Sequence, residues 1–219
     1  MVLPSSTRPV PSVRLRLSLA VAGSAFTFFL LLLIGPTASA QSGAVTATAA
    51  LDELVDQAAT VVRGSVVSAA IEPHPQLSNL QTVVVTVSVA KVLKGESAKI
   101  LTFRQFVWDP HDAADAAGYR KGGELLLFLN PVSTYGLTSP VGLDQGRFRI
   151  FRDAKGKAFA VNGRANVALF DHVLSKASSR GINFSRQAAA AMTAPPGPQG
   201  RVPLESLEDA IAILAKAGR

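Results

Sequence analysis

The stretch TVVVTVSVA, residues 82–90, decides the fold of this chain. The valines at positions 83, 85, 87 and 89 alternate with Thr82, Val84, Thr86 and Ser88. A period of two places alternate side chains on opposite faces of a β-strand. The sequence therefore predicts a strand with one face in the core and the other partly exposed to water.

Further strands are expected on both sides of this one. Residues 61–68 are rich in β-branched side chains and contain Gly64, a pattern typical of a strand with a bend. Residues 99–106 follow a Lys94-Gly95 turn and predict the second arm of a hairpin. The apolar run Leu125 to Leu129 indicates a strand buried on both faces. The remaining candidates are residues 137–141, 147–151 and 158–161.

A helix is predicted at each end of this series of strands. Apolar residues recur at helical spacing over about residues 50–60, and again in a C-terminal helix over 201–219. The expected docking face of the second helix consists of Leu204, Leu207, Ile211 and Leu214. Residues 41–49 predict a flexible segment, and the Ala-, Ser- and Pro-rich residues 171–200 predict a mobile linker. The expected fold class is mainly β (α+β), a small OB-like β-barrel of five to six strands over residues 50–170.

A resemblance to a known family rests on four segments in a fixed order. These are residues 61–66, 92–95, 121–129 and 146–150. This succession resembles a group of secreted bacterial proteins and is similar to the barrel of netrin-like modules and tissue inhibitors of metalloproteinases, over roughly residues 58–152. The resemblance implies an OB-like barrel. Those inhibitors reach the metal of their target with an N-terminal cysteine, and this chain has no cysteine.

The first forty residues predict a secretory signal peptide. Three arginines precede an apolar run from Leu17 to Ile34, and the run ends at Gly35-Pro36 before Thr37-Ala38-Ser39-Ala40. A basic start, an apolar middle and small residues before the cut are the parts of such a signal. The run is about 18 residues long, near the lower limit of roughly 17 for a transmembrane helix, so an uncleaved anchor is the alternative. Cleavage after Ala40 predicts a secreted or periplasmic bacterial protein, with a membrane contact only where the signal stays attached.

Charge and cysteine content exclude several classes of function. The predicted signal contains three arginines and no acid, so its removal lowers the formal net charge from +7 to +4. No dense cluster of Lys and Arg remains, and nucleic acid is not an expected partner. The absence of cysteine removes thiol nucleophiles, cysteine-type zinc sites and disulfides. No cofactor is expected.

The loop-like residues 107–122 hold the candidates for a metal site. His111, Asp112 and Asp115 offer one nitrogen and two carboxylates to a divalent cation. Asp109, Asp112 and Asp115 are an alternative, all-oxygen set for calcium. The chain has no His-Glu-x-x-His pair, no Gly-x-Ser-x-Gly elbow and no phosphate-binding loop.

The same loop holds the candidates for a partner-binding surface. Trp108 is the only tryptophan and lies between Phe106 and Asp109. Tryptophan and tyrosine are enriched where binding energy concentrates in protein interfaces. Tyr119 and Tyr135 flank the apolar strand and are expected to extend this surface.

Two functions from different classes follow from these patterns. The first is an exported, non-enzymatic binding or inhibitory module that presents barrel loops to a protein or carbohydrate partner. The second is a secreted metal-dependent hydrolase with a dispersed site around His111. The lack of any catalytic motif favours the binding module.

Overall fold

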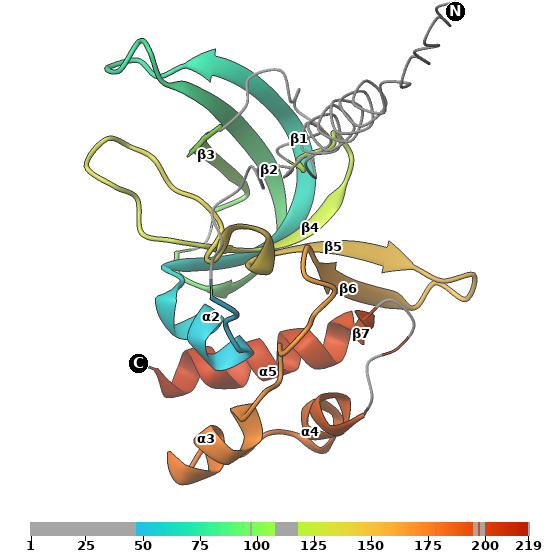
Figure 1. Cartoon of the computed structure of the whole chain (residues 1–219). Helices are drawn as coiled ribbons and strands as arrows, with labels where there is room; N and C mark the ends of the chain where they lie inside the picture. The colour runs from blue at the N-terminus through green and yellow to red at the C-terminus, as the bar shows by residue number, and fades with distance from the viewer. Residues whose placement is uncertain (1–46, 97, 108–117, 195–196, 198–199, 219) are drawn as a thin grey trace, which may run out of the picture. The chain divides into compact units, whose positions relative to one another are not determined.

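The computed structural model describes residues 47–96, 98–107, 118–194, 197 and 200–218. This part of the chain contains seven strands, four α-helices and one 3-10 turn (Figure 1). In chain order they are α2 (Leu51–Gln57), β1 (Thr60–Pro73), β2 (Gln81–Lys94), β3 (Ile100–Phe106), β4 (Glu124–Leu129), the 3-10 turn η1 (Leu143–Gln145), β5 (Arg147–Arg152), β6 (Ala158–Asn162), α3 (Val173–Ser179), α4 (Arg186–Thr193), β7 (Val202–Pro203) and α5 (Leu204–Ala217).

The strands form one antiparallel sheet in the order β3-β2-β1-β4-β5-β6-β7. The predicted α+β class, dominated by β-structure, is confirmed. The predicted barrel of five to six strands is not confirmed, because the sheet is open. The physical reason lies in residues 137–141, a predicted strand that pairs with its neighbours only through two isolated bridges, Arg104–Leu137 and Leu129–Pro140. Two single bridges do not make the continuous ladder that closes a barrel.

The bend of the sheet comes from its two longest strands. β1 and β2 each contain 14 residues, and their pairing register shifts at three places between Val61 and Ser68. Such bulges bend a strand and increase its twist. A side chain at Gly64 would meet the backbone carbonyl of Ser88 at 2.3 Å, so glycine is required where the two strands approach.

The bent sheet separates two buried clusters. β4 is buried on both faces, as its apolar run predicts. Its even-numbered residues, Leu126 and Phe128, join the helices, and its odd-numbered residues point to the other side. The helix-side core includes Leu51, Leu54, Val55, Val61, Leu126, Phe128, Phe148, Leu169, Leu204, Leu207, Ile211 and Leu214. The strand-side core consists of Val62, Val66, Val83, Val85, Val87, Phe103, Tyr119, Leu125, Leu127 and Leu129.

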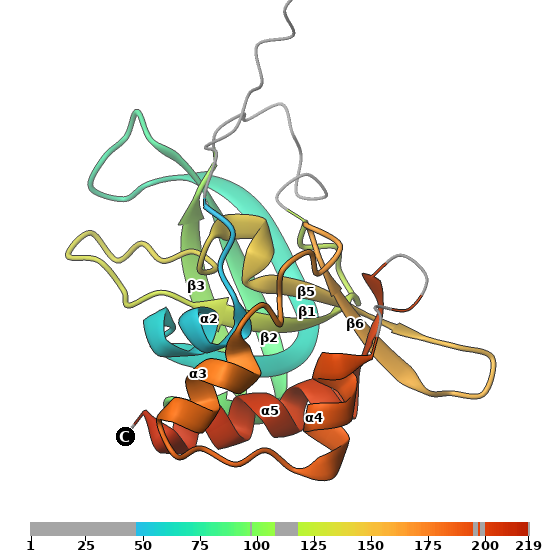
Figure 2. The same ribbon diagram turned by 60° about the horizontal axis from the view of Figure 1, so that its bottom comes forward.

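The four helices lie together on one side of the sheet (Figure 2). α5 packs against α2, α4 and the strands β2 and β6, and the predicted docking face of this helix is buried. The N-terminal helix expected over residues 50–60 is confirmed as the shorter α2.

Residues 171–200 differ from the linker that their composition predicts. They contain two helices, α3 and α4. The Ser185 hydroxyl caps α4 by accepting the Ala188 N–H and also donates to the Asp209 carboxylate on α5. Val173, Ala177 and Ala188 are buried, so small side chains are sufficient to dock these short helices.

Candidate functional site

Five of the predicted site residues lie outside the described residues. They are Trp108 and Asp109 of the partner-binding set and the metal candidates His111, Asp112 and Asp115. Three members of the partner-binding set, Phe106, Tyr119 and Tyr135, can be placed.

The placement of Tyr119 contradicts the prediction that it extends a binding surface. Its side chain is 1% exposed and belongs to the strand-side core. The ring packs edge-on against Phe103 with a centroid distance of 5.6 Å, and the Arg147 guanidinium lies over it at 5.1 Å. The hydroxyl donates a 2.5 Å hydrogen bond to the Gln105 side chain. Burial raises the pKa of Tyr119 to about 12, although the positive charge of Arg147 acts in the opposite direction.

Tyr135 does lie on the surface, as predicted. It is 55% exposed in the loop between β4 and η1, and Val132 of the same loop is 68% exposed. A tight turn forms this loop, in which the Gly136 N–H bonds to the Ser133 carbonyl and the Ser133 N–H to the Leu137 carbonyl. Two exposed apolar side chains are thus displayed on an internally bonded loop.

His74 connects that loop to the β1–β2 hairpin. The imidazole is 2% exposed, and its Nδ1 accepts the N–H groups of Gln76 and Leu77 at 3.2 and 3.1 Å. Because Nδ1 is an acceptor, Nε2 carries the proton and donates to the Tyr135 carbonyl at 2.8 Å. His74 is therefore a structural link between the two loops. The sequence patterns do not single out His74; its position between Pro73 and Pro75, near a hairpin turn, was the available signal.

The end of β3 lies beside the same hairpin. Phe106 is half-buried opposite Thr82 of β2, and the Val107 N–H bonds to the Gln81 carbonyl at 3.2 Å. Thr138 links this strand to the Tyr135 loop through its N–H bond to the Arg104 carbonyl at 2.9 Å. The structure thus brings the predicted residues Phe106 and Tyr135 to one end of the sheet.

We define the tip surface as the apolar side chains that these three segments present. The hairpin tip and the Tyr135 loop project on the same side of the molecule (Figure 1). A neighbouring ion pair, Arg104 with Glu72 at 3.4 Å, supplies polar groups beside it. The tip surface consists of Leu77, Phe106, Val132 and Tyr135.

The residues that the structure describes do not form a candidate metal site. No group of three or more His, Asp or Glu side chains in this part of the chain could hold a metal ion. His172, paired in sequence with Asp171, precedes α3 in a left-handed conformation and makes no described side-chain hydrogen bond.

No protein-family model, curated protein or solved structure matches this chain. The resemblance to netrin-like modules therefore stays a prediction. Within the described ranges, no helix is both long and apolar enough to cross a membrane.

Proposed function

We propose that this protein is an exported, non-enzymatic binding module that contacts a protein partner through its tip surface. The observation that carries the proposal is the link made by His74. A buried, fully bonded histidine fixes two separate loops against each other, and both loops then expose apolar side chains. An interface that is ordered before binding loses less conformational entropy when the partner arrives.

The chemistry of the tip surface favours a protein over a carbohydrate. Leu77 and Val132 are aliphatic, and Tyr135 adds one aromatic ring with a polar end. Protein interfaces combine such an apolar centre with a polar rim, which Arg104 and Glu72 supply here. A sugar-binding face needs several free hydrogen-bonding groups, whereas these two charged groups already pair with each other.

The proposal includes an OB-like arrangement of the strands that carry the tip. Residues 137–140 bridge Arg104 of β3 and Leu129 of β4, which is where a closing strand of such a barrel would lie. In OB-like barrels the loops at the rim contact ligands, and the tip surface is formed by rim loops of this kind.

The experiment is affinity capture from an exported-protein extract of the host, with the intact protein as bait. Tyr135→Ala is expected to reduce recovery of a specific partner at least about tenfold, the loss typical of an interface hot spot. The matched control is Val167→Ala, since Val167 is 66% exposed but lies on the loop after β6. A partner recovered equally well with both variants, or no saturable partner at all, would contradict the proposal.

A further inference from the structure

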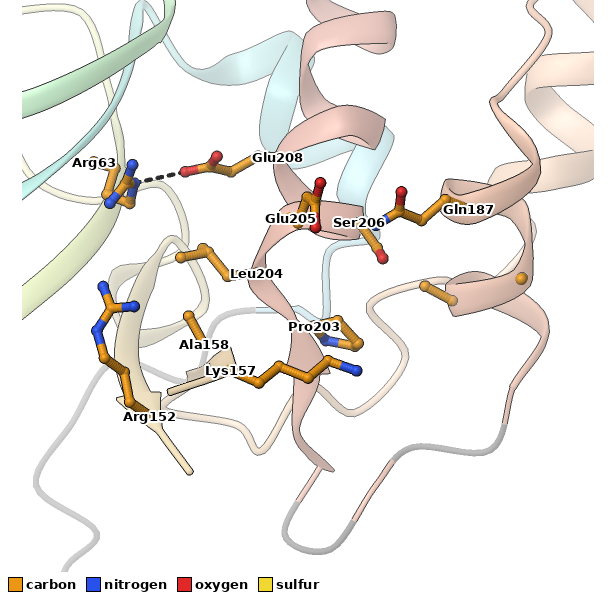
Figure 3. Close-up of a pocket in the computed structure, with 12 residues that line it drawn as sticks. Arg63, Arg152, Lys157, Ala158, Gln187, Pro203, Leu204, Glu205, Ser206 and Glu208 are labelled. Carbon is orange, nitrogen blue, oxygen red and sulfur yellow. Dashed lines mark hydrogen bonds and ion pairs between the residues drawn. The ribbon is translucent and has the colours of Figure 1, made fainter. Parts of the chain in front are cut away.

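A second candidate site lies among the helices, in a cavity of about 670 Å³ (Figure 3). Its walls come from the β5–β6 hairpin, from α4 and from the first turn of α5. Ala158, Ala190 and Ala191 form an apolar wall. The cavity is large enough for a small organic molecule, and its polar groups indicate which kind.

The cationic groups of the cavity outnumber its carboxylates. Arg63, Arg152 and Lys157 line it together with Glu205 and Glu208, so the lining carries one excess positive charge. The Lys157 ammonium forms no ion pair with a carboxylate among the described residues, and its Nζ lies 5.5 Å from the centre of the Phe159 ring.

Glu208 is neutralised by its own partners. It accepts hydrogen bonds from Arg63 Nε and Lys91 Nζ, both at 2.7 Å, and Figure 3 shows the first of these pairs. Burial alone would lower the pKa of Arg63, but the hydrogen bond to Glu124 and the charges of Glu208 and Glu124 outweigh it and raise that pKa. Arg63 therefore stays charged beside the cavity.

The first turn of α5 adds N–H donors. Pro203 occupies the N-cap position and offers no side-chain cap, although α5 is 14 residues long. The N–H groups of Leu204, Glu205 and Ser206 lie in this uncapped turn, which borders the cavity. Such groups bear partial positive charge and bind anions.

Ser206 adds a hydroxyl group to the lining of the cavity. The residue is 5% exposed, and its hydroxyl oxygen, which solvent still reaches, makes no hydrogen bond in the described part of the chain. This hydroxyl is therefore free to form a hydrogen bond with a ligand in the cavity.

We infer that this cavity binds a small organic anion through a phosphate or sulfate group. Lys157 supplies the charge together with Arg152, which also pairs with Glu124 at 2.9 Å. The Ser206 hydroxyl and the first-turn N–H groups of α5 supply hydrogen bonds. The alanine wall receives the apolar part of the molecule. The inference is independent of the tip surface, which involves other residues.

The test is an NMR titration of the intact ¹⁵N-labelled protein with inorganic phosphate, phenyl phosphate and phenyl sulfate. Saturable shifts are expected at the amides of Leu204, Glu205 and Ser206. The two phenyl esters are expected to bind at least about tenfold more tightly than inorganic phosphate, because their ring covers the alanine wall. Equal affinity for all three probes would overturn the assignment of an organic ligand.

Variants expected to change the affinity in opposite directions distinguish a specific binding site from a general effect of the protein's charge. Lys157→Gln and Ser206→Ala are each expected to weaken phenyl phosphate binding by about tenfold, the loss of one charge-assisted hydrogen bond. Glu205→Gln removes a repelling charge and is expected to tighten it by about threefold.

Lys155→Gln is the matched control. Lys155 is an exposed lysine of the same hairpin and does not line the cavity. Its variant is expected to bind phenyl phosphate within a factor of about two of the parent. Shifts that respond alike to the Lys155 and Lys157 variants, or no saturable shift at α5, would overturn the inference.

Discussion

The helix-side and strand-side cores share β1 and β4 but are closed in different ways. The helix-side core is covered by α2, α3, α4 and α5, which bring their own apolar faces to the sheet. The strand-side core is enclosed by the bend of β1 and β2 and includes Tyr119, which lies ahead of β4. One sheet thus uses docked helices on one face and its own curvature on the other. The β1–β2 hairpin that provides this curvature also carries Leu77 of the tip surface at its far end.

The largest expected effect tests whether the two cores unfold as one unit. Phe128→Ala removes a fully buried ring from the helix-side core and is expected to cost about 3–5 kcal/mol. Leu127→Ala, one residue earlier on β4, removes a side chain of the strand-side core at a cost of about 2–5 kcal/mol. Urea unfolding followed by circular dichroism measures both. Because β4 belongs to both cores, each variant should keep a single transition; two separate transitions would show independent units.

The buried phenol of Tyr119 makes the stability of the strand-side core depend on alkaline pH. The folded pKa of about 12 exceeds the ordinary value of 10.0, so the folded state binds this proton more tightly than the unfolded chain. The contribution is fully present below pH 10 and is lost as pH rises toward 12, by about 2–3 kcal/mol.

Denaturant unfolding at a series of alkaline pH values measures this loss. In the Tyr119→Phe variant, the loss of free energy of unfolding attributed to Tyr119 should disappear as pH rises toward 12. The Tyr135→Phe variant, changed at an exposed position, should retain this loss. An equal loss in the Tyr119→Phe variant would contradict the assignment.

A smaller effect on the free energy of unfolding is expected at the ion pairs that link α5 to the sheet. Glu208 of α5 is 6% exposed and holds Arg63 of β1 and Lys91 of β2. Glu208→Gln removes the charge that both cations share, and because both are partly exposed we expect a loss of about 2 kcal/mol. Glu205→Gln on the same helix should change the free energy of unfolding by less than about 0.5 kcal/mol. If thermal unfolding shows the same loss of stability for both substitutions, the ion pairs of Glu208 do not contribute to the stability of the fold.

The smallest effect on global stability is expected at His74. His74→Ala removes three hydrogen bonds at the hairpin tip and is expected to cost about 1–2 kcal/mol, mostly as local opening. Hydrogen exchange should show faster exchange at the amides of Gln76 and Leu77, with little change at Val85 and Val87 in the middle of β2. Uniformly faster exchange along β2 would mean that His74 supports the whole sheet.

Much of this fold could be predicted from local sequence patterns. The period of two in residues 82–90 predicted β2 and its buried face, and the apolar run at 125–129 predicted the doubly buried β4. Open or closed topology could not be predicted, because closure depends on whether residues 137–141 pair along their length. The helices at 171–200 were missed because Ser185 and small alanines dock them through contacts distant in sequence.

The candidate surfaces were harder to predict for the same reason. Tyr119 and Tyr135 both flank β4 in the sequence, yet one is buried and the other exposed. The link between His74 and the Tyr135 carbonyl spans 61 residues, and the cavity at α5 combines groups from six helices and strands. No local pattern contains either arrangement.

Site-specific photo-crosslinking in the host tests the proposed function most directly. A photoreactive phenylalanine analogue is placed at position 135 in one strain and at position 167, the exposed position away from the tip, in another. We predict a discrete protein adduct at position 135 that is lost on His74→Ala, and no such adduct at position 167. Adducts of the same pattern at both positions, or an adduct at position 135 that survives the loss of His74, would contradict a preorganised binding surface at the tip.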